Sequence, residues 1–170
     1  VLGSEFSGMP KAVQKDGNVL TIPMLDLGGN IWSLQFISDH KKRFLHGKQP
    51  SGLFYRIGNP GHDDAPVYLT EGFATGASLY QETGLCVYVS FSAGNLAKTG
   101  RILRTKYFRK PIFIMSDDDW ATAGNPGLTA ARKAAESING ELIIPDFTGM
   151  NRGQKDTDFN DWLRLGKDNG

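Results

Sequence analysis

The 170-residue sequence has a single cysteine, no long apolar run and almost no net charge, and each shortage excludes a class of protein. One cysteine, Cys86, cannot form an internal disulfide or a cysteine-rich zinc site. Without about 18 consecutive apolar residues or a signal-peptide pattern, we expect no transmembrane helix and a cytoplasmic location. A net charge of +1 excludes binding to nucleic acid through bulk charge alone, so any such binding would depend on local patches.

The remaining metal-binding and nucleophilic residue types are sparse. His40, His46 and His62 follow no zinc-ligand spacing, and we interpret them as ordinary loop residues. Cys86 begins an apolar run, which is typical of a buried core residue. The chemistry of this chain is therefore expected to depend on carboxylates and basic side chains.

The sequence divides into two segments of opposite charge. Residues 1–8 include a stretch typical of a cloning junction, and we exclude them and expect the chain to be part of a longer protein. Residues 1–60 carry seven basic and four acidic side chains, whereas residues 61–170 carry twelve and fourteen. The turn-rich stretch 58–66 separates them. We therefore predict a small β-rich segment over 9–60 and a second domain over 67–168.

The first segment is expected to contain a β-hairpin. Residues 19–25 and 31–37 are β-rich and flank a Gly- and Asn-containing turn, and residues 43–45 and 52–57 could add further strands. Basic residues gather at a predicted loop between these strands: Lys41, Lys42, Arg43 and Lys48. This group is either a solvated turn or a contact for nucleic acid.

The second segment alternates between strands and helices. Short apolar runs over 67–70, 86–91, 111–115 and 141–145 predict four strands. Helical spacing lies between them, and a last helix is expected from residue 160. This alternation predicts an α/β fold with a parallel sheet of about four strands flanked by helices, in which ligands gather at the carboxyl ends of the strands.

Acidic side chains follow the first and third of these strands. Glu71 ends the first, and Asp117, Asp118 and Asp119 follow the third. In an extended segment, Asp117 and Asp119 point the same way, and convergent carboxylates favour a hard cation such as Mg²⁺ or Mn²⁺. Asp158, or Asp161, could join them. The alternative is a solvated aspartate-rich loop that caps a helix.

A basic run lies beside this predicted site. Between residues 98 and 110 there are six basic side chains and no acidic one: Lys98, Arg101, Arg104, Lys106, Arg109 and Lys110. Lys98, Arg101 and Arg104 recur every three residues, away from the apolar face of the predicted helix. They form either a track for phosphates, which Arg152 and Lys155 could extend, or a solvated helix face.

Three motifs together resemble a Toprim domain, the domain shared by bacterial-type primases, topoisomerases and some nucleases. They are the strand with Glu-Gly at 68–72, the strand with Asp-x-Asp at 112–119, and the Gly-x-x-Ala-Ala-Arg-Lys-Ala-Ala stretch at 127–135. The ending at 142–146 followed by 156–163 is similar to primases of plasmids, phages and mobile elements. Here seven residues, 120–126, separate Asp-x-Asp from the glycine that follows it more closely in bacterial primases.

The resemblance implies roles for matched positions. Glu71 would be a general acid or base or a metal ligand, and Asp117 and Asp119 would bind Mg²⁺ or Mn²⁺, with Asp158 or Asp161 as a further acidic partner. The implied function is the catalytic core of a DNA primase, which synthesises short RNA primers from ribonucleoside triphosphates on a single-stranded DNA template. Zinc-binding and helicase domains or proteins would be its partners.

Two other functions remain open at this point. A Toprim nuclease would use the same acids to direct water at a phosphodiester. A nucleic-acid-binding fragment would depend on domains outside this chain for activity.

Overall fold

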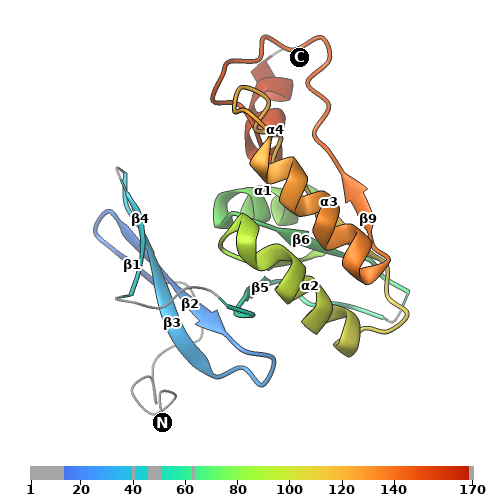
Figure 1. Ribbon diagram of the computed structural model, residues 1–170. Helices are drawn as coiled ribbons and strands as arrows, with labels where there is room; N and C mark the ends of the chain where they lie inside the picture. The colour runs from blue at the N-terminus through green and yellow to red at the C-terminus, as the bar shows by residue number, and fades with distance from the viewer. Residues whose placement is uncertain (1–13, 40, 46–50, 63, 169–170) are drawn as a thin grey trace.

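Two β-sheets stand side by side in the computed structural model, which describes residues 14–39, 41–45, 51–62 and 64–168 (Figure 1). The first sheet is antiparallel, with the order β1-β2-β3-β4. Its strands are β1 (Gln14–Asp16), β2 (Val19–Leu25), β3 (Ile31–Ile37) and β4 (Lys42–Phe44). The predicted hairpin is thus confirmed, and β4 extends it on the β3 side.

The second sheet has five strands in the order β5-β7-β6-β8-β9. Four of them are parallel, as predicted: β6 (Val67–Thr70), β7 (Cys86–Val89), β8 (Ile112–Met115) and β9 (Glu141–Ile143). The edge strand β5 (Tyr55–Ile57) is antiparallel to β7. Within the predicted stretch 52–57, residues 55–57 therefore add a strand to this sheet, whereas Phe54 forms an isolated bridge with Leu25 of the hairpin. The strand precedes the turn-rich stretch at which we divided the chain.

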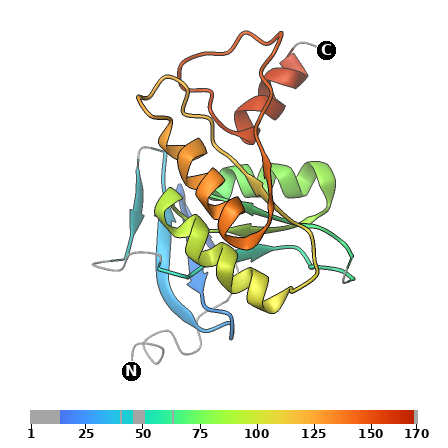
Figure 2. The same cartoon turned by 45° about the vertical axis from the view of Figure 1, so that its right-hand side comes forward.

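Four helices cover the two faces of the second sheet. Helices α2 (Ala93–Lys106) and α3 (Pro126–Ile138) lie together on one face, and α1 (Phe73–Thr83) and α4 (Phe159–Asp168) lie on the other (Figure 2). No helix in the described part of the chain is long and apolar enough to cross a membrane. The predicted α/β class is confirmed.

The apolar periodicity of the sequence explains how these layers pack. Leu96 and Leu103, four and three residues from Gly100, form the buried stripe of α2, and the missing side chain of Gly100 leaves room for Ile138 of α3. Strand residues such as Leu69 and Ile114 are fully buried because helices cover the sheet on both sides. Cys86 is also buried, as expected, and burial raises the pKa of its thiol to about 11.

A buried asparagine joins the N-terminal segment to the second sheet. Asn95, in the first turn of α2, accepts a hydrogen bond from the Gly52 backbone N–H (2.6 Å) and donates to the Leu53 carbonyl (2.8 Å) and the Ser90 carbonyl (2.7 Å). Asn95 is 4% exposed, and its contacts with Gly52 and Ser90 are buried while that with Leu53 is partly buried. One side chain thus satisfies backbone groups from two segments that lie about forty residues apart in the sequence.

Replacing Asn95 with alanine should therefore destabilise the fold. The substitution leaves buried backbone groups without partners, which costs about 1–3 kcal/mol per group. We expect a drop of at least that size in the free energy of unfolding, measured by urea denaturation. The exposed Asn151 provides the control, and an equal loss in Asn151→Ala would contradict the role assigned to Asn95.

Candidate active site

Two adjacent strands deliver the acidic residues to one edge of the second sheet. Strands β6 and β8 pair in register, with Thr70 opposite Met115, so Glu71 and Asp117 follow neighbouring strand ends. The start of α2 lies beside them because β7 also ends at this edge. The predicted convergence of Glu71 with the aspartates after β8 is what this register produces.

Glu71 is held at the start of α2. Its backbone carbonyl accepts from Phe91 N–H (2.8 Å), and its carboxylate accepts a hydrogen bond from the backbone N–H of Ala93. Burial raises the pKa of Glu71, and the nearby charges of Asp119 and Asp158 act in the same direction. A carboxyl with a raised pKa can exchange a proton near neutral pH more readily than an exposed glutamate.

Asp117 has the most perturbed pKa among the acids described here. Burial raises it to about 8, and repulsion from Glu71, Asp158 and Asp119 adds to that shift. Its Oδ1 atom is buried and has no hydrogen-bond partner among the described residues. A buried, unpaired carboxylate oxygen surrounded by other carboxylates is where a cation would be most stabilising.

Asp119 depends on the glycine that begins the next helix. Its Oδ2 accepts a hydrogen bond from the backbone N–H of Gly127 (2.9 Å), at the N-terminus of α3. A Cβ at position 127 would lie 2.8 Å from that oxygen and 3.0 Å from the carbonyl oxygen of Asp117. Only glycine lets α3 approach the aspartates this closely.

The middle aspartate, Asp118, anchors the segment. Its Oδ1 accepts from Asn125 Nδ2 (2.6 Å), and its Oδ2 forms an ion pair with Arg152 (2.8 Å). The guanidinium of Arg152 also donates to the carbonyls of Asp118 and Asp156 and lies 4.0 Å from the ring centroid of Phe147. Because alternate residues point in opposite directions in extended backbone, fixing Asp118 helps to direct its two neighbours toward Glu71.

The additional residues 120–126 close back onto this anchor. Trp120 also contacts Arg152, with its ring centroid 5.3 Å from the guanidinium carbon. Asn125 is the N-cap of α3, where its side chain accepts from Leu128 N–H, and it also donates to Asp118. The inserted stretch is therefore tied to Asp118 near its end and to Arg152, the partner of Asp118, at its start.

The structure separates the roles of Asp158 and Asp161. Asp158 accepts from Thr75 Oγ1 of α1 (2.6 Å), and its charge contributes to the raised pKa values of Glu71 and Asp117. Asp161 instead accepts from the backbone N–H groups of Thr157 and Asp158, while Asp158 accepts from Asp161 N–H. This reciprocal pair is a capping box at the start of α4, so Asp158 joins the acidic group and Asp161 closes the helix end.

Four carboxylates thus lie near enough at the sheet edge to shift one another's pKa values, and we call Glu71, Asp117, Asp119 and Asp158 the acidic group. Among the described residues, no three His, Cys, Asp or Glu side chains are arranged so that they could hold a metal ion. The donor chemistry of the acidic group nevertheless fits a hard divalent cation, because all four side chains are carboxylates and Asp117 Oδ1 has no hydrogen-bond partner among the described residues.

Lys42 of β4 brings positive charge to the acidic group. Its charge lowers the pKa values of both Glu71 and Asp117, in opposition to the effect of burial. Lys41 and Arg43 are exposed beside it, and the Arg43 guanidinium lies 5.6 Å from the ring centroid of Phe36. Lys48 lies outside the described residues. Nucleic-acid binding by these residues stays a prediction.

The basic run of α2 is only partly available to a ligand. Arg104 donates to the carbonyls of Ile138, Tyr107, Phe108 and Lys110, and Lys98 donates to Ser51 Oγ (2.7 Å). Arg101 and, in the later loop, Lys155 are exposed. The buried ammonium of Lys110 donates to the carbonyls of Pro60, His62 and Ala65. Nucleic-acid binding stays a prediction for five residues: Lys98, Arg101, Arg104, Lys155 and Arg152. The guanidinium groups of Arg104 and Arg152, however, already donate hydrogen bonds to acceptors within the chain.

The sequence of this chain is similar to a known domain family and to named proteins. Residues 66–168 match the Toprim domain family. The chain is 33% and 35% identical, over 142 residues each, to two proteins named DNA primase TraC from Escherichia coli. These matches cover 78% of this chain but 10% and 13% of the relatives, so the chain spans about a tenth of their length.

The fold is also similar to that of a solved primase fragment. The primase fragment of the bacteriophage T7 primase-helicase protein has a TM-score of 0.61 and 17% sequence identity to this chain. The similarity covers 92% of this chain and 62% of that fragment. It therefore includes the N-terminal sheet as well as the second sheet.

Breaking the anchor at Asp118 should destabilise the protein. Arg152→Gln removes a largely buried ion pair and leaves Asp118 Oδ2 without its partner, which we expect to cost about 1–3 kcal/mol of unfolding free energy. Arg164→Gln is the control, because Arg164 is 52% exposed and its ion pair with Asp156 should contribute less than about 1 kcal/mol. Equal losses in both variants, measured by urea denaturation, would contradict the anchoring role.

The pKa of Asp117 predicts a pH-dependent stability in the absence of divalent cations. The folded state holds a proton on Asp117 up to about pH 8, whereas the unfolded chain releases it near pH 4, so stability falls as pH rises between these values. Asp117→Asn removes this loss. We expect the variant to be more stable than the parent at pH 9 by more than about 1 kcal/mol, and not at pH 4, in thermal unfolding with chelator. If the difference in stability between Asp117→Asn and the parent were the same at pH 4 and at pH 9, the raised pKa of Asp117 would be refuted.

Proposed function

Because this chain belongs to the Toprim domain family, we propose that it is the catalytic part of a DNA primase. The observation that carries the proposal is the acidic group, in which the unpaired Oδ1 of Asp117 lies among three further carboxylates. The similarity to proteins named DNA primase TraC supports a nucleotidyltransferase that makes short RNA primers on single-stranded DNA.

The acidic group would hold Mg²⁺ or Mn²⁺. Asp117 and Asp119 are the proposed principal ligands, with Glu71 and Asp158 beside them. When bound, such an ion neutralises the triphosphate of the incoming nucleotide and lowers the pKa of the attacking 3′-hydroxyl. Asp117, whose pKa is raised by burial and by repulsion from the neighbouring carboxylates, would lose its proton on binding a cation.

Residues of the chain itself supply positioning and charge. Glu71, whose carboxylate accepts from the Ala93 N–H, would accept or return a proton beside the proposed metal ligands. Lys42, whose charge lowers the pKa values of Glu71 and Asp117, would attract the phosphates of a nucleotide. The acidic group and Lys42 come from different sheets, so the substrate would bind where the two sheets meet.

Other parts of a primase would come from outside this chain. We propose zinc-binding and helicase domains or proteins as partners, in line with the much greater length of the TraC relatives. Template DNA and ribonucleoside triphosphates would be the substrates. Such an enzyme would act in the cytoplasm, where bacterial DNA is replicated.

The test is a primer-synthesis assay with the chain, single-stranded DNA, ribonucleoside triphosphates and Mg²⁺ or Mn²⁺. We expect short oligoribonucleotides whose yield falls by more than about 100-fold in Asp117→Asn, since a direct ligand should matter more than an outer-shell residue. Asp146→Asn is the matched control, because Asp146 also follows a strand, but its carboxylate bonds only to Thr148 near the surface.

Three outcomes would contradict the proposal or its site assignment. Shortening of the input nucleic acid without new product would favour a Toprim nuclease. Binding of single-stranded DNA without any product would favour a nucleic-acid-binding fragment. Product that persists in Asp117→Asn would refute the assignment of the acidic group.

A further inference from the structure

A second site lies at the opposite end of α2 from the acidic group. A cavity of about 250 Å³ opens where the turn after β2, strand β5 and the last turn of α2 meet. Helix α2 begins beside Glu71 and has 14 residues, so its two ends are about 20 Å apart. The cavity is therefore separate from the proposed metal site, although the same helix borders both.

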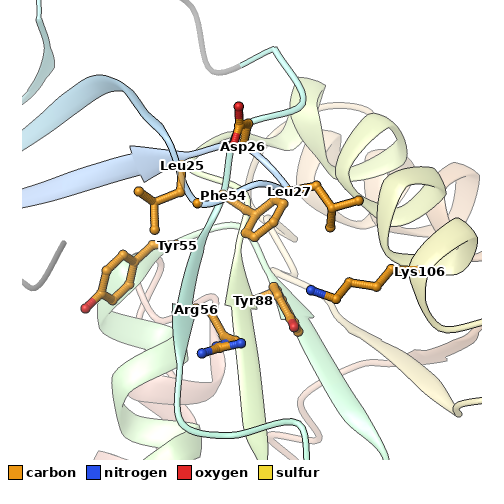
Figure 3. A pocket seen from close by; sticks show the side chains of 9 residues that line it. Leu25, Asp26, Leu27, Phe54, Tyr55, Arg56, Tyr88 and Lys106 are labelled. Atoms are coloured by element: carbon orange, nitrogen blue, oxygen red, sulfur yellow. The ribbon is translucent and has the colours of Figure 1, made fainter. Parts of the chain in front are cut away.

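Two cations without ion-pair partners lie at this cavity. Arg56 comes from β5 and Lys106 from the end of α2, and in Figure 3 the ammonium of Lys106 extends from the helix into the space beside Phe54 and Tyr88. Neither cation forms an ion pair within the part of the chain that the structure describes. By contrast, Arg104 and Lys110, which are close in sequence, have their donors filled by backbone carbonyls.

The wall of the cavity is apolar and aromatic. Phe54 and Tyr88 pack edge to face with ring centroids 5.3 Å apart, and the Tyr88 hydroxyl is paired with that of Tyr107 at 2.6 Å. One acid, Asp26, borders the space, but its carboxylate already accepts from Trp32 Nε1 (2.7 Å) and from Asn30. Arg56 and Lys106 are therefore the groups left for a ligand, since the ring contact between the Lys106 ammonium and Tyr107 (5.5 Å to the centroid) does not neutralise charge.

An exposed aromatic residue continues this surface. A second hollow, which shares Lys106 with the cavity, is lined by residues 106–110. In it Phe108 is 82% exposed, more than any other large apolar side chain in the described ranges, and it lies between Lys106 and the exposed Arg109 in sequence. An exposed ring flanked by cations suits the stacking of a base with neutralisation of the phosphates beside it.

We propose that this surface, formed by Arg56, Lys106, Phe108 and Arg109, binds a segment of single-stranded nucleic acid. The proposal rests on the proposed function, because a strand held there would run along α2 between the acidic group and this surface. The cavity is smaller than the roughly 300–1,000 Å³ of typical small-molecule sites, which fits one unit of a strand better than a whole cofactor. Bases would stack on Phe108, and Arg56, Lys106 and Arg109 would contact phosphates.

The test is fluorescence anisotropy of a labelled 16-nucleotide single-stranded DNA with the full chain, in chelator, so that metal-dependent chemistry plays no part. In the double variant Arg56→Ala, Lys106→Ala we expect binding to weaken at least about tenfold, and the slope of log affinity against log salt to fall by about 1.4 for two phosphate contacts. In Phe108→Ala we expect a loss of about tenfold with an unchanged salt slope, because stacking releases no counterions.

The matched control is the double variant Arg132→Ala, Lys133→Ala, which removes the same two residue types from an exposed face of α3. We expect it to bind within about twofold of the parent. Equal weakening in the two double variants, or unchanged binding in Phe108→Ala, would overturn the proposal. Binding of a mononucleotide is measured with labelled ATP in the same variants. If Arg56→Ala, Lys106→Ala lost ATP binding but kept strand binding, the cavity would be a site for a free nucleotide, and the proposal would be overturned.

The strand-binding assay tests the second site separately from the primer-synthesis assay, which tests the proposed function. Primer synthesis that depends on Asp117, together with strand binding that ignores Arg56, Lys106 and Phe108, would refute only the second site. Strand binding that depends on these residues in a chain that makes no primer would refute only the primase assignment.

Discussion

The arrangement of this protein depends on keeping four carboxyl groups together at one edge of a parallel sheet. Burial, with repulsion from the other three added to it, raises the pKa of Asp117 to about 8. Such a group is stable only where the fold holds each carboxylate by other contacts. Ala93 N–H holds Glu71, Gly127 N–H holds Asp119, and Thr75 holds Asp158, so the unmet oxygen is left on Asp117.

The ion pair of Asp118 with Arg152 lets the chain tolerate this repulsion. Three consecutive aspartates would repel one another in any backbone conformation, but here the middle one is neutralised on the far side. Arg152 is itself held by the rings of Phe147 and Trp120 and by its hydrogen bonds to Asp118 and Asp156. Asp118 therefore helps to fix the positions of its neighbours Asp117 and Asp119 although it does not belong to the acidic group. The inserted stretch 120–126 supports Asp118 through Trp120, which contacts Arg152, and Asn125, which donates to Asp118.

Local sequence patterns predicted the elements well and the side-chain partnerships less well. The hairpin, the four parallel strands and the convergence of Glu71 with Asp117 all follow from short-range periodicity and strand order. The pairing of β5 with β7 could not be predicted, because an edge strand of three residues carries little pattern. The contacts of Asn95 with residues 52 and 53 link distant segments and leave no periodic trace. The capping box that separates Asp158 from Asp161 was visible as a spacing of three residues before a helix, and would have decided between them.

The basic residues show why charge clusters in a sequence are a poor guide to charge on a surface. The densest basic run, residues 98–110, contains Arg104 and Lys110, whose donors are filled by carbonyls, and Arg152 is paired with Asp118. A guanidinium or ammonium that satisfies several buried carbonyls cannot leave them for a phosphate without exposing an unpaired polar group. The cations left for a ligand are instead distributed over both sheets, with Lys42 beside the acidic group and Arg56 with Lys106 at the other end of α2. A net charge near zero thus conceals a separation of charge along one helix, with anions and their expected metal ion at its start and unpaired cations at its end.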